Sequence, residues 1–319
     1  MRTRLTDLLG IKYPIIQGAM ALVSEAKLVA AVGNAGGAGV IASGGRNDEW
    51  VRSQIRLARQ LTNKPFGVNI VFKDKDVEDK IKVICEEEIA FITTGAGNPV
   101  RYIDTFHRAG IKVIPVVSSL KLAKRVEAGG ADAIVIEGME SGGYIGKLTT
   151  LALMTQVITE VSVPVIAAGG FSDGRGLAAA LVMGAAGIQM GTRFYASTEC
   201  VSHLNAKQAI VNADDTDTEI IGSLHGPAVR IVKNKLSDKF LEEEKAGASA
   251  QKLADLVADA PRKASEEGDT EWGAVYAGQS LSMIKSIGSC TGILEQVVEE
   301  AKQAIRDAQV YSSTIRVYR

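Results

Sequence analysis

Eight short apolar runs that alternate with amphipathic segments constrain the fold of this chain more than any other feature. The runs lie at 14–17, 39–42, 66–70, 90–93, 112–117, 133–136, 165–168 and 187–190, and most are apolar throughout, as strands covered on both faces are. The segments between them carry apolar residues at helical spacing, at 25–34, 48–62, 77–87, 102–109, 120–129, 150–161 and 174–184. The pattern predicts repeated βα units around a parallel sheet.

Eight such units favour an α/β fold of the closed TIM (β/α)8 type over an open doubly wound sheet. The first strand is not followed by the GxGxxG fingerprint of a dinucleotide-binding sheet, since the glycines at 33–39 come before a strand. We expect the barrel to occupy residues 1–222 and a smaller helical region to occupy 223–319.

The second region has its own internal signals. Longer, charged segments at 239–245, 250–258 and 291–309 read as helices, whereas 311–319 carries no clear signal. The glycine-rich, apolar stretch 272–280 is unsuited to a solvent-exposed helix. We expect it to fold back onto the barrel at the cofactor site.

Composition narrows the function classes. Thirty-six basic residues face 37 acidic ones, so a net charge of -1 provides no general field for a nucleic acid or an anionic membrane. Cys85, Cys200 and Cys290 are odd in number and widely separated, which favours buried thiols over a disulfide framework or a zinc site. No metal site is expected. The first residues lack a signal-peptide core and no run is long enough to span a bilayer, so a cytoplasmic enzyme is expected.

Glycines and small polar residues follow most of the predicted strands, where the active site of such a barrel collects. Gly169, Gly170, Gly191 and Thr192 follow strands seven and eight, the usual place for a phosphate in these barrels. Each glycine could simply form a tight turn, but two such turns at the expected strands favour phosphate binding. Small and polarizable residues after strand one, with amides and hydroxyls at Gln17, Asn69 and Thr94, suit a flavin ring.

The loop after strand six, residues 137–147, is the candidate for chemistry. It contains Glu137, the glycine pair Gly142 and Gly143, and Tyr144, whose hydroxyl carries an acidic proton within this glycine-rich loop. Glu137 and Glu140 lack the partners of a hydrolytic carboxylate pair, so we expect them to order the loop or contact the cofactor.

The chain resembles the FMN-dependent enoyl-acyl-carrier-protein reductase II family, within the group that contains the nitronate monooxygenases. The resemblance covers nearly the whole chain and rests on PIIQGAM at 14–20, KPFGVN at 64–69, TTGAGNP at 93–99, VIPVV at 113–117, EGMESGG at 137–143, IGKLTT at 145–150, PVIAAGG at 164–170, QMGTRF at 189–194 and AGQ at 277–279. The segments at 93–99 and 145–150 point to the reductase branch more than to the monooxygenases.

The resemblance implies a TIM barrel that binds FMN, takes electrons from NADH or NADPH and reduces the carbon–carbon double bond of a trans-2-enoyl thioester. The substrate partner would be an enoyl-acyl carrier protein or enoyl-CoA, and the assembly a homodimer. The implied cofactor contacts are Gly18, Ala19, Met20, Asn69, Thr94, Ala96, Glu137, Gly142, Gly143, Ala168, Gly169, Gly170, Met190, Gly191, Thr192, Gly278 and Gln279.

Two positions depart from the family pattern. Tyr144 stands where both branches have histidine, and Pro227 stands at the histidine position of a Gly-His-x-Val-Arg pattern, with His225 two residues earlier. A histidine exchanges protons near pH 6.5, whereas a tyrosine of pKa about 10 mainly donates a hydrogen bond. Tyr144 is the candidate catalytic proton donor. The alternatives are nitronate oxidation and a flavin-binding paralogue without enoyl reductase activity.

Overall fold

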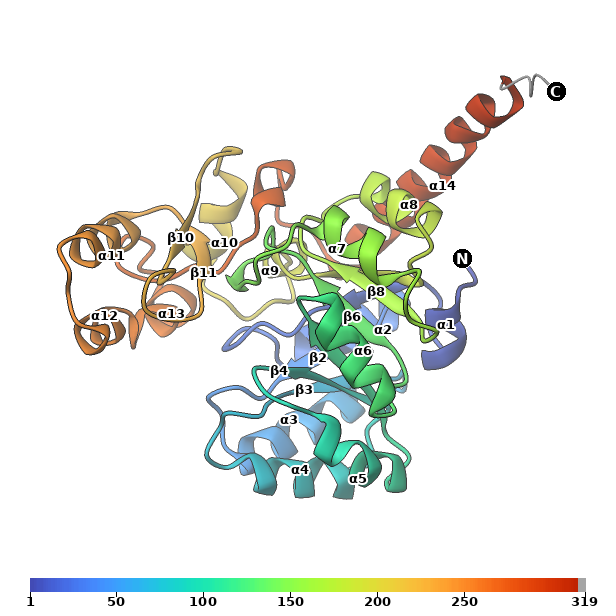
Figure 1. The fold of residues 1–319 in the computed structure, drawn as a ribbon, viewed down its shortest axis with the longest axis horizontal. Coiled ribbons are helices and arrows are strands. Elements are labelled where there is room, and N and C mark those ends of the chain that lie inside the picture. Colours follow the sequence, from blue (N-terminus) through green and yellow to red (C-terminus); the bar gives the residue numbers. More distant parts are fainter. Residues whose placement is uncertain (315–319) are drawn as a thin grey trace.

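The computed structural model describes residues 1–314, with side chains through residue 310, and contains a parallel barrel (Figure 1). Its strands are β1 (Ile15–Gln17), β2 (Val40–Ala42), β3 (Gly67–Val71), β4 (Phe91–Gly95), β5 (Lys112–Val117), β6 (Ile134–Glu137), β8 (Val165–Ala168) and β9 (Gly187–Met190). They follow the order β1-β9-β8-β6-β5-β4-β3-β2, and every neighbouring pair is parallel. The predicted TIM barrel is confirmed.

The seam between β1 and β2 closes through a short parallel bridge and one amide side chain. Ile16 bridges Ala38, just before β2. The Oε1 atom of Gln17 accepts the N–H of Val40 at 3.1 Å, and its Nε2 atom donates to the hydroxyl of Ser24 at 2.9 Å. The Gln17 amide, which the sequence offered for the cofactor, is therefore used to close the barrel.

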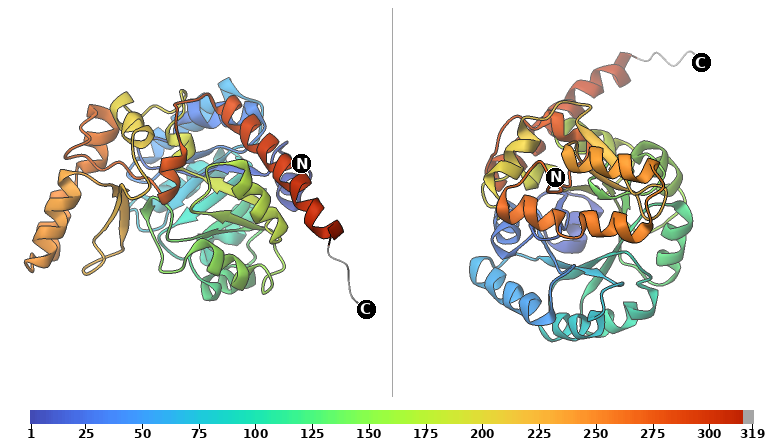
Figure 2. Two further views of the ribbon diagram at one scale, coloured as in Figure 1. Left: turned by 90° about the horizontal axis from the view of Figure 1, so that it is seen from above. Right: turned by 90° about the vertical axis from the view of Figure 1, so that its left-hand side faces the viewer.

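Helices surround the strands, as the right-hand view of Figure 2 shows. They are α1 (Arg4–Leu9), α2 (Ala26–Ala35), α3 (Asp48–Leu61), α4 (Val77–Glu86), η1 (Val100–Tyr102), α5 (Ile103–Arg108), α6 (Leu120–Ala128), α7 (Thr150–Val157) and α8 (Gly174–Val182). Side chains of Asn47, Ser119 and Asp173 accept backbone N–H bonds in the first turns of α3, α6 and α8 and so fix where these helices begin.

Strand side chains alternate between the barrel interior and the helix layer. Interior packing includes Phe91 of β4, Val135 of β6 and Ile166 of β8. Their neighbours along the chain, such as Ile92 and Ile136, pack outward against the helices. Because the period is two, this alternation decides which residues at the strand ends face the barrel mouth.

The chain after β9, called the C-terminal region from here on, lies beside the barrel and contains a hairpin as well as helices (Figure 1). Its elements are α9 (Thr192–Tyr195), α10 (Leu204–Val211), β10 (Thr218–Ile221), β11 (Val229–Val232), α11 (Lys235–Lys245), α12 (Ala250–Val257), α13 (Ala260–Arg262), η2 (Lys263–Glu267), η3 (Gln279–Met283) and α14 (Cys290–Thr314). β11 also pairs with β7 (Gly143–Tyr144), which joins the hairpin to the loop after β6.

The last helix returns to the barrel. α14 packs against α8 and α2, and a Cβ atom on Gly174 would lie 2.3 Å from the carbonyl of Val297. The left-hand view of Figure 2 shows the helix crossing this face. Of the stretch predicted to be a tail, residues 311–314 continue α14 and 315–319 lie outside the described residues. Within residues 1–314, no helix is both long and apolar enough to cross a membrane.

Candidate functional site

The loops after β6 and β8 are bound tightly to each other at the carboxyl ends of the strands. The Gly138 N–H donates to the Ala168 carbonyl at 3.0 Å, and the Thr150 hydroxyl donates to the Gly169 carbonyl at 2.9 Å. The Glu140 carboxylate accepts both the N–H and the hydroxyl of Thr150 at 2.9 Å. Glu140 therefore orders the loop at the start of α7, as the sequence suggested.

Residues 277–279 reach this rim from the C-terminal region. The Gly278 N–H donates to the Thr192 hydroxyl at 2.9 Å, and the Gln279 N–H donates to the Glu140 carbonyl at 2.9 Å. A Cβ atom on Gly142 would lie 2.7 Å from the Ala277 backbone, and one on Gly278 would lie 2.5 Å from the Glu140 carbonyl. Both glycines are therefore required by close backbone approach.

The predicted site residues fall into two groups on one rim of the barrel. The first group surrounds the ends of β1, β6, β8 and β9 and comprises Gly18, Ala19, Met20, Glu137, Gly142, Gly143, Ala168, Gly169, Gly170, Met190, Gly191, Thr192, Gly278 and Gln279, with Tyr144 on the adjoining β7. The second group, Asn69, Thr94 and Ala96, lies at the ends of β3 and β4, which β5 separates from β6.

Because side chains alternate along each strand, two of these residues do not direct their side chains into the barrel mouth. The Asn69 amide donates to the Thr93 hydroxyl at 2.9 Å on the interior side, so the side chain of Thr94 faces the helix layer. The side chain of Met190 also packs in the outer core, whereas that of Gln189 lies against Gly18. Thr93 and Gln189 are the interior residues at these positions. Counting the alternation from the preceding apolar residues could have identified them.

Backbone N–H groups converge at the ends of β8 and β9. Among the described residues 1–314, none accepts a hydrogen bond from the N–H of Gly170, Gly191 or Thr192. Gly169 and Gly170 have φ angles of 91° and 81°, in the left-handed region that favours glycine. Unpaired N–H groups beside a helix start suit an anion, so this part of the rim fits a phosphate group.

Glu137 is the charged side chain at the end of β6. Val135 packs inside the barrel, and alternation therefore directs Glu137 toward the barrel mouth. Burial raises the pKa of Glu137 to about 7. No described residue within 1–314 donates a hydrogen bond to its carboxyl group, so the group is free to meet a polar ligand.

Tyr144 lies at the outer edge of the mouth. It pairs with Val229 across β7 and β11, and its side chain is 67% exposed. Burial raises the pKa of the neighbouring Tyr276 to about 12, and the charge of an ionised Tyr144 contributes to this rise. Tyr144 is thus open to a substrate.

The histidines occupy other places. His225 is exposed in the hairpin loop, three residues before Ala228, whose carbonyl accepts the Ile145 N–H at 3.0 Å. His107 pairs with Asp132 at 2.8 Å, and the His203 side chain caps α10. His225 therefore lies in the hairpin that pairs with β7, whereas His107 and His203 make local structural contacts.

Arg230 braces the β6 loop, a role that the sequence pattern did not reveal. Its guanidinium donates to the Met139 carbonyl at 3.1 and 3.3 Å and to the Thr218 hydroxyl at 2.9 Å. The side chain is buried, and burial lowers its pKa. The contact is visible only once β11 is placed beside the loop.

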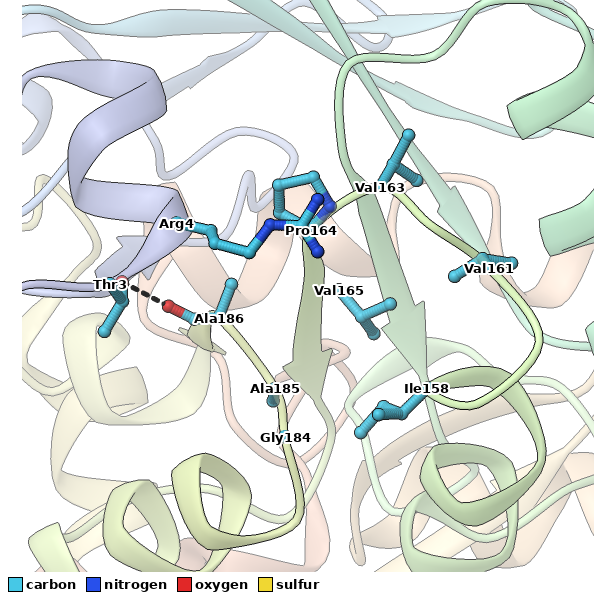
Figure 3. A pocket seen from close by; sticks show the side chains of 10 residues that line it. All are labelled: Thr3, Arg4, Ile158, Val161, Val163, Pro164, Val165, Gly184, Ala185 and Ala186. Atoms are coloured by element: carbon cyan, nitrogen blue, oxygen red, sulfur yellow. Dashed lines mark hydrogen bonds between the residues drawn. The ribbon is translucent and has the colours of Figure 1, made fainter.

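A separate hollow of about 120 Å³ lies at the opposite end of the barrel (Figure 3). Its walls include Thr3 and Arg4, the segment before β8 and the turn before β9. The hollow is remote from the strand ends that carry the glycine loops, so it is not the candidate site. Within residues 1–314, no group of three or more His, Cys, Asp or Glu side chains is arranged to hold a metal ion.

Comparison with known proteins decides the family. The sequence profile of the nitronate monooxygenase family matches residues 2–87 and 74–300. The chain belongs to the nitronate monooxygenase family. It is accordingly an oxidoreductase, and the resemblance inferred from the sequence is confirmed.

Relatives within this family carry different names. The solved structure of FabK from Thermotoga maritima is 43% identical, with a TM-score of 0.95 over 98% of this chain and 99% of that chain. A nitroalkane oxidase from Streptomyces ansochromogenes is 27% identical, with a TM-score of 0.86 over 96% and 100%. A "(3aS,4S,5R,7aS)-5-hydroxy-7a-methyl-1-oxo-octahydro-1H-indene-4-carboxyl-CoA dehydrogenase" from Rhodococcus jostii is 31% identical over 96% of this chain and 97% of its own.

Proposed function

We propose that this protein is an FMN-dependent reductase of trans-2-enoyl thioesters that uses NADH or NADPH. The observation that carries the proposal is the full-length likeness to FabK, which is of the enoyl-acyl-carrier-protein reductase II type. Its 43% identity exceeds the 27% of the nitroalkane oxidase. The CoA thioester in the name of the Rhodococcus relative also supports a thioester substrate.

The rim offers hydrogen-bond donors and polar side chains that suit a flavin mononucleotide. The free N–H groups of Gly170, Gly191 and Thr192 would bind the phosphate, whose charge they complement. Met20 packs beside Gly191, where a Cβ atom would lie 3.8 Å from its sulfur, so this thioether would cover the cofactor near the β9 end. Glu137 and Asn69 would offer polar contacts from the interior of the mouth.

FMN, when bound, supplies hydride transfer between the nicotinamide and the enoyl thioester. The side chains of this protein would position both substrates and provide the proton. The exposed Tyr144 hydroxyl would donate that proton to the α-carbon of the thioester.

Anaerobic titration tests the proposal. The purified protein should bind FMN, NADH or NADPH should bleach the bound flavin, and crotonyl-CoA or crotonyl-acyl carrier protein should restore its absorbance. A protein that binds FMN but does not oxidise either nicotinamide in the presence of these thioesters would refute the enoyl reductase proposal.

Nitronate oxidation is the second candidate, because the matching profile and several relatives carry that name. A probable nitronate monooxygenase from Staphylococcus aureus is 30% identical over 96% of this chain and 99% of its own. Tyr144 argues against it, since a phenol hydroxyl replaces the imidazole base that the family pattern has at this position. Oxygen uptake with propionate 3-nitronate in the absence of NADH and NADPH would favour this candidate over the reductase.

A further inference from the structure

The β6 loop contains a buried hydroxyl group with no partner. The Ser141 side chain belongs to a residue that is only 8% exposed, and among the described residues its Oγ atom has no hydrogen-bond partner. A buried polar group without a partner destabilises the folded protein, because it has given up its hydrogen bonds to water and gained none in return. The Ser141 hydroxyl therefore lowers the stability of the folded protein unless a ligand forms a hydrogen bond with it.

The loop around Ser141 is held so firmly that it offers no easy rearrangement. The carbonyl of Met139 accepts from Arg230, and its N–H donates to Leu148 at 2.8 Å. The Glu140 carbonyl accepts the N–H of Gln279, and the Ser141 N–H donates to Gly138 at 3.2 Å. Backbone groups on either side are thus paired, while the hydroxyl is not.

The other buried side-chain atom without a partner in the described residues has a different explanation. It is Nε of Arg46, whose guanidinium pairs with Glu25 at 3.5 Å and Glu266 at 3.8 Å. The Arg46 guanidinium also lies over the ring of Trp50, which covers it further. Charge is therefore compensated at Arg46 within the chain, whereas nothing compensates the hydroxyl of Ser141.

The surroundings of Ser141 are those proposed for the phosphate end of the cofactor. A Cβ atom on Gly278 would lie 3.3 Å from the Ser141 carbonyl carbon, and Gly278 itself is bonded to Thr192. On the other side, a Cβ atom on Gly170 would lie 3.5 Å from the Cβ atom of Glu140. Ser141 therefore lies between the β8 end and the Thr192–Gly278 contact.

We infer that Ser141 is a flavin-binding residue whose hydroxyl donates a hydrogen bond to an oxygen of the ribityl phosphate chain of FMN. The inference rests on the proposed cofactor and extends it to a residue that the sequence did not single out. It explains why a polar side chain is kept at a buried position where the neighbouring backbone groups are paired within the chain.

The test uses Ser141→Ala, which removes one oxygen and adds no bulk. FMN dissociation constants come from quenching of flavin fluorescence, and unfolding midpoints come from thermal melts of flavin-free protein. The variant should bind FMN about tenfold more weakly than the wild type, while its flavin-free midpoint stays equal or rises. These opposite directions separate a ligand contact from a packing contact.

Ser197→Ala is the matched control, because Ser197 is also buried and its hydroxyl donates to the Phe194 carbonyl at 2.7 Å. This variant should lower the flavin-free midpoint and leave the FMN dissociation constant unchanged. Riboflavin locates the bond: a loss of affinity by Ser141→Ala for FMN alone places it at the phosphate, and a loss for both flavins places it at the ribityl chain.

An unchanged FMN dissociation constant in Ser141→Ala, or a lowered flavin-free midpoint, would overturn the inference. Failure of the wild-type protein to bind FMN is a distinct result. It would overturn the proposed cofactor, and the role of Ser141 with it.

Discussion

Glu137 combines an acidic side chain with a half-buried position at the mouth, and this predicts a pH dependence. Its pKa in the folded protein is about 7, against an ordinary value of 4.5. Between these values the folded state binds more protons than the unfolded state, so stability should fall as the pH rises from 4.5 to 7. Urea unfolding of flavin-free protein measures the free energy of unfolding at pH 5 and pH 8. The decrease in this free energy between the two pH values should be smaller in Glu137→Gln than in the wild type, by no more than about 3 kcal/mol. Equal losses in both proteins would contradict the assignment.

Tyr144 gives a second prediction at the scale of the residue. If its hydroxyl donates the proton, Tyr144→Phe should slow reduction of crotonyl-CoA at least tenfold, because positioned general acids contribute about 10²–10⁴-fold. Reduction of the bound flavin by NADH or NADPH should keep its rate. Stopped-flow absorbance separates the two half-reactions. Tyr13→Phe, before β1 at the other end of the barrel, is the control, and an unchanged rate in Tyr144→Phe would leave Tyr144 no catalytic role.

The site residues differ in how far the sequence could identify them. Glycine runs after strands were sufficient to indicate the rim, because parallel strands place all their carboxyl ends on one side. Thr94 and Met190 were assigned from motif position, although alternation turns their side chains outward. Ser141 and Arg230 could not be found in this way, since their roles depend on contacts made by residues far away in the sequence.

At the scale of the element, the contact between residues 277–279 and the β6 loop predicts a steric effect. Gly278→Ala should displace this segment, because a Cβ atom would lie 2.5 Å from the Glu140 carbonyl. The cost should be about 1–3 kcal/mol, with weaker FMN binding. Thermal melts and flavin titrations measure both effects.

Gly226→Ala is the matched control for this substitution. A Cβ atom there would meet nothing closer than 4.0 Å, in the loop between β10 and β11. This control should behave as the wild type does. Equal behaviour of the two alanine variants would mean that the segment yields freely and does not constrain the rim.

Elements of the barrel were predictable because their signals are local. Strands buried on both faces read as apolar runs, and the observed bounds of all eight lie within two residues of the predicted ones. The hairpin of β10 and β11 was missed because its strand β11 pairs with β7, a strand of two residues some 85 positions earlier. Such pairing depends on tertiary placement and leaves no periodic pattern in β7 itself.

At the scale of the whole molecule, the chain leaves the barrel and returns to it. β11 pairs with β7, residues 277–279 contact the β6 loop, and α14 packs on α8 and α2, so the C-terminal region is joined to the barrel at three places. Residues such as Ile293, Leu294 and Val298 of α14 are buried in the same core as the barrel helices. Because α14 shares the core of the barrel helices and the hairpin pairs with β7, the two parts should unfold in one cooperative transition.

The two tryptophans of the chain report on the two parts separately. Trp50 lies on α3 of the barrel, and Trp272 lies in the segment that leads to residues 277–279. Trp272→Phe leaves a barrel reporter and Trp50→Phe leaves a C-terminal one. In each variant, the fluorescence transition in urea should have the same midpoint as the circular dichroism transition of that variant. A fluorescence transition of Trp272 that precedes loss of barrel helicity would mean that the C-terminal region unfolds independently, because the β7 and α14 contacts would then be too weak to couple it to the barrel.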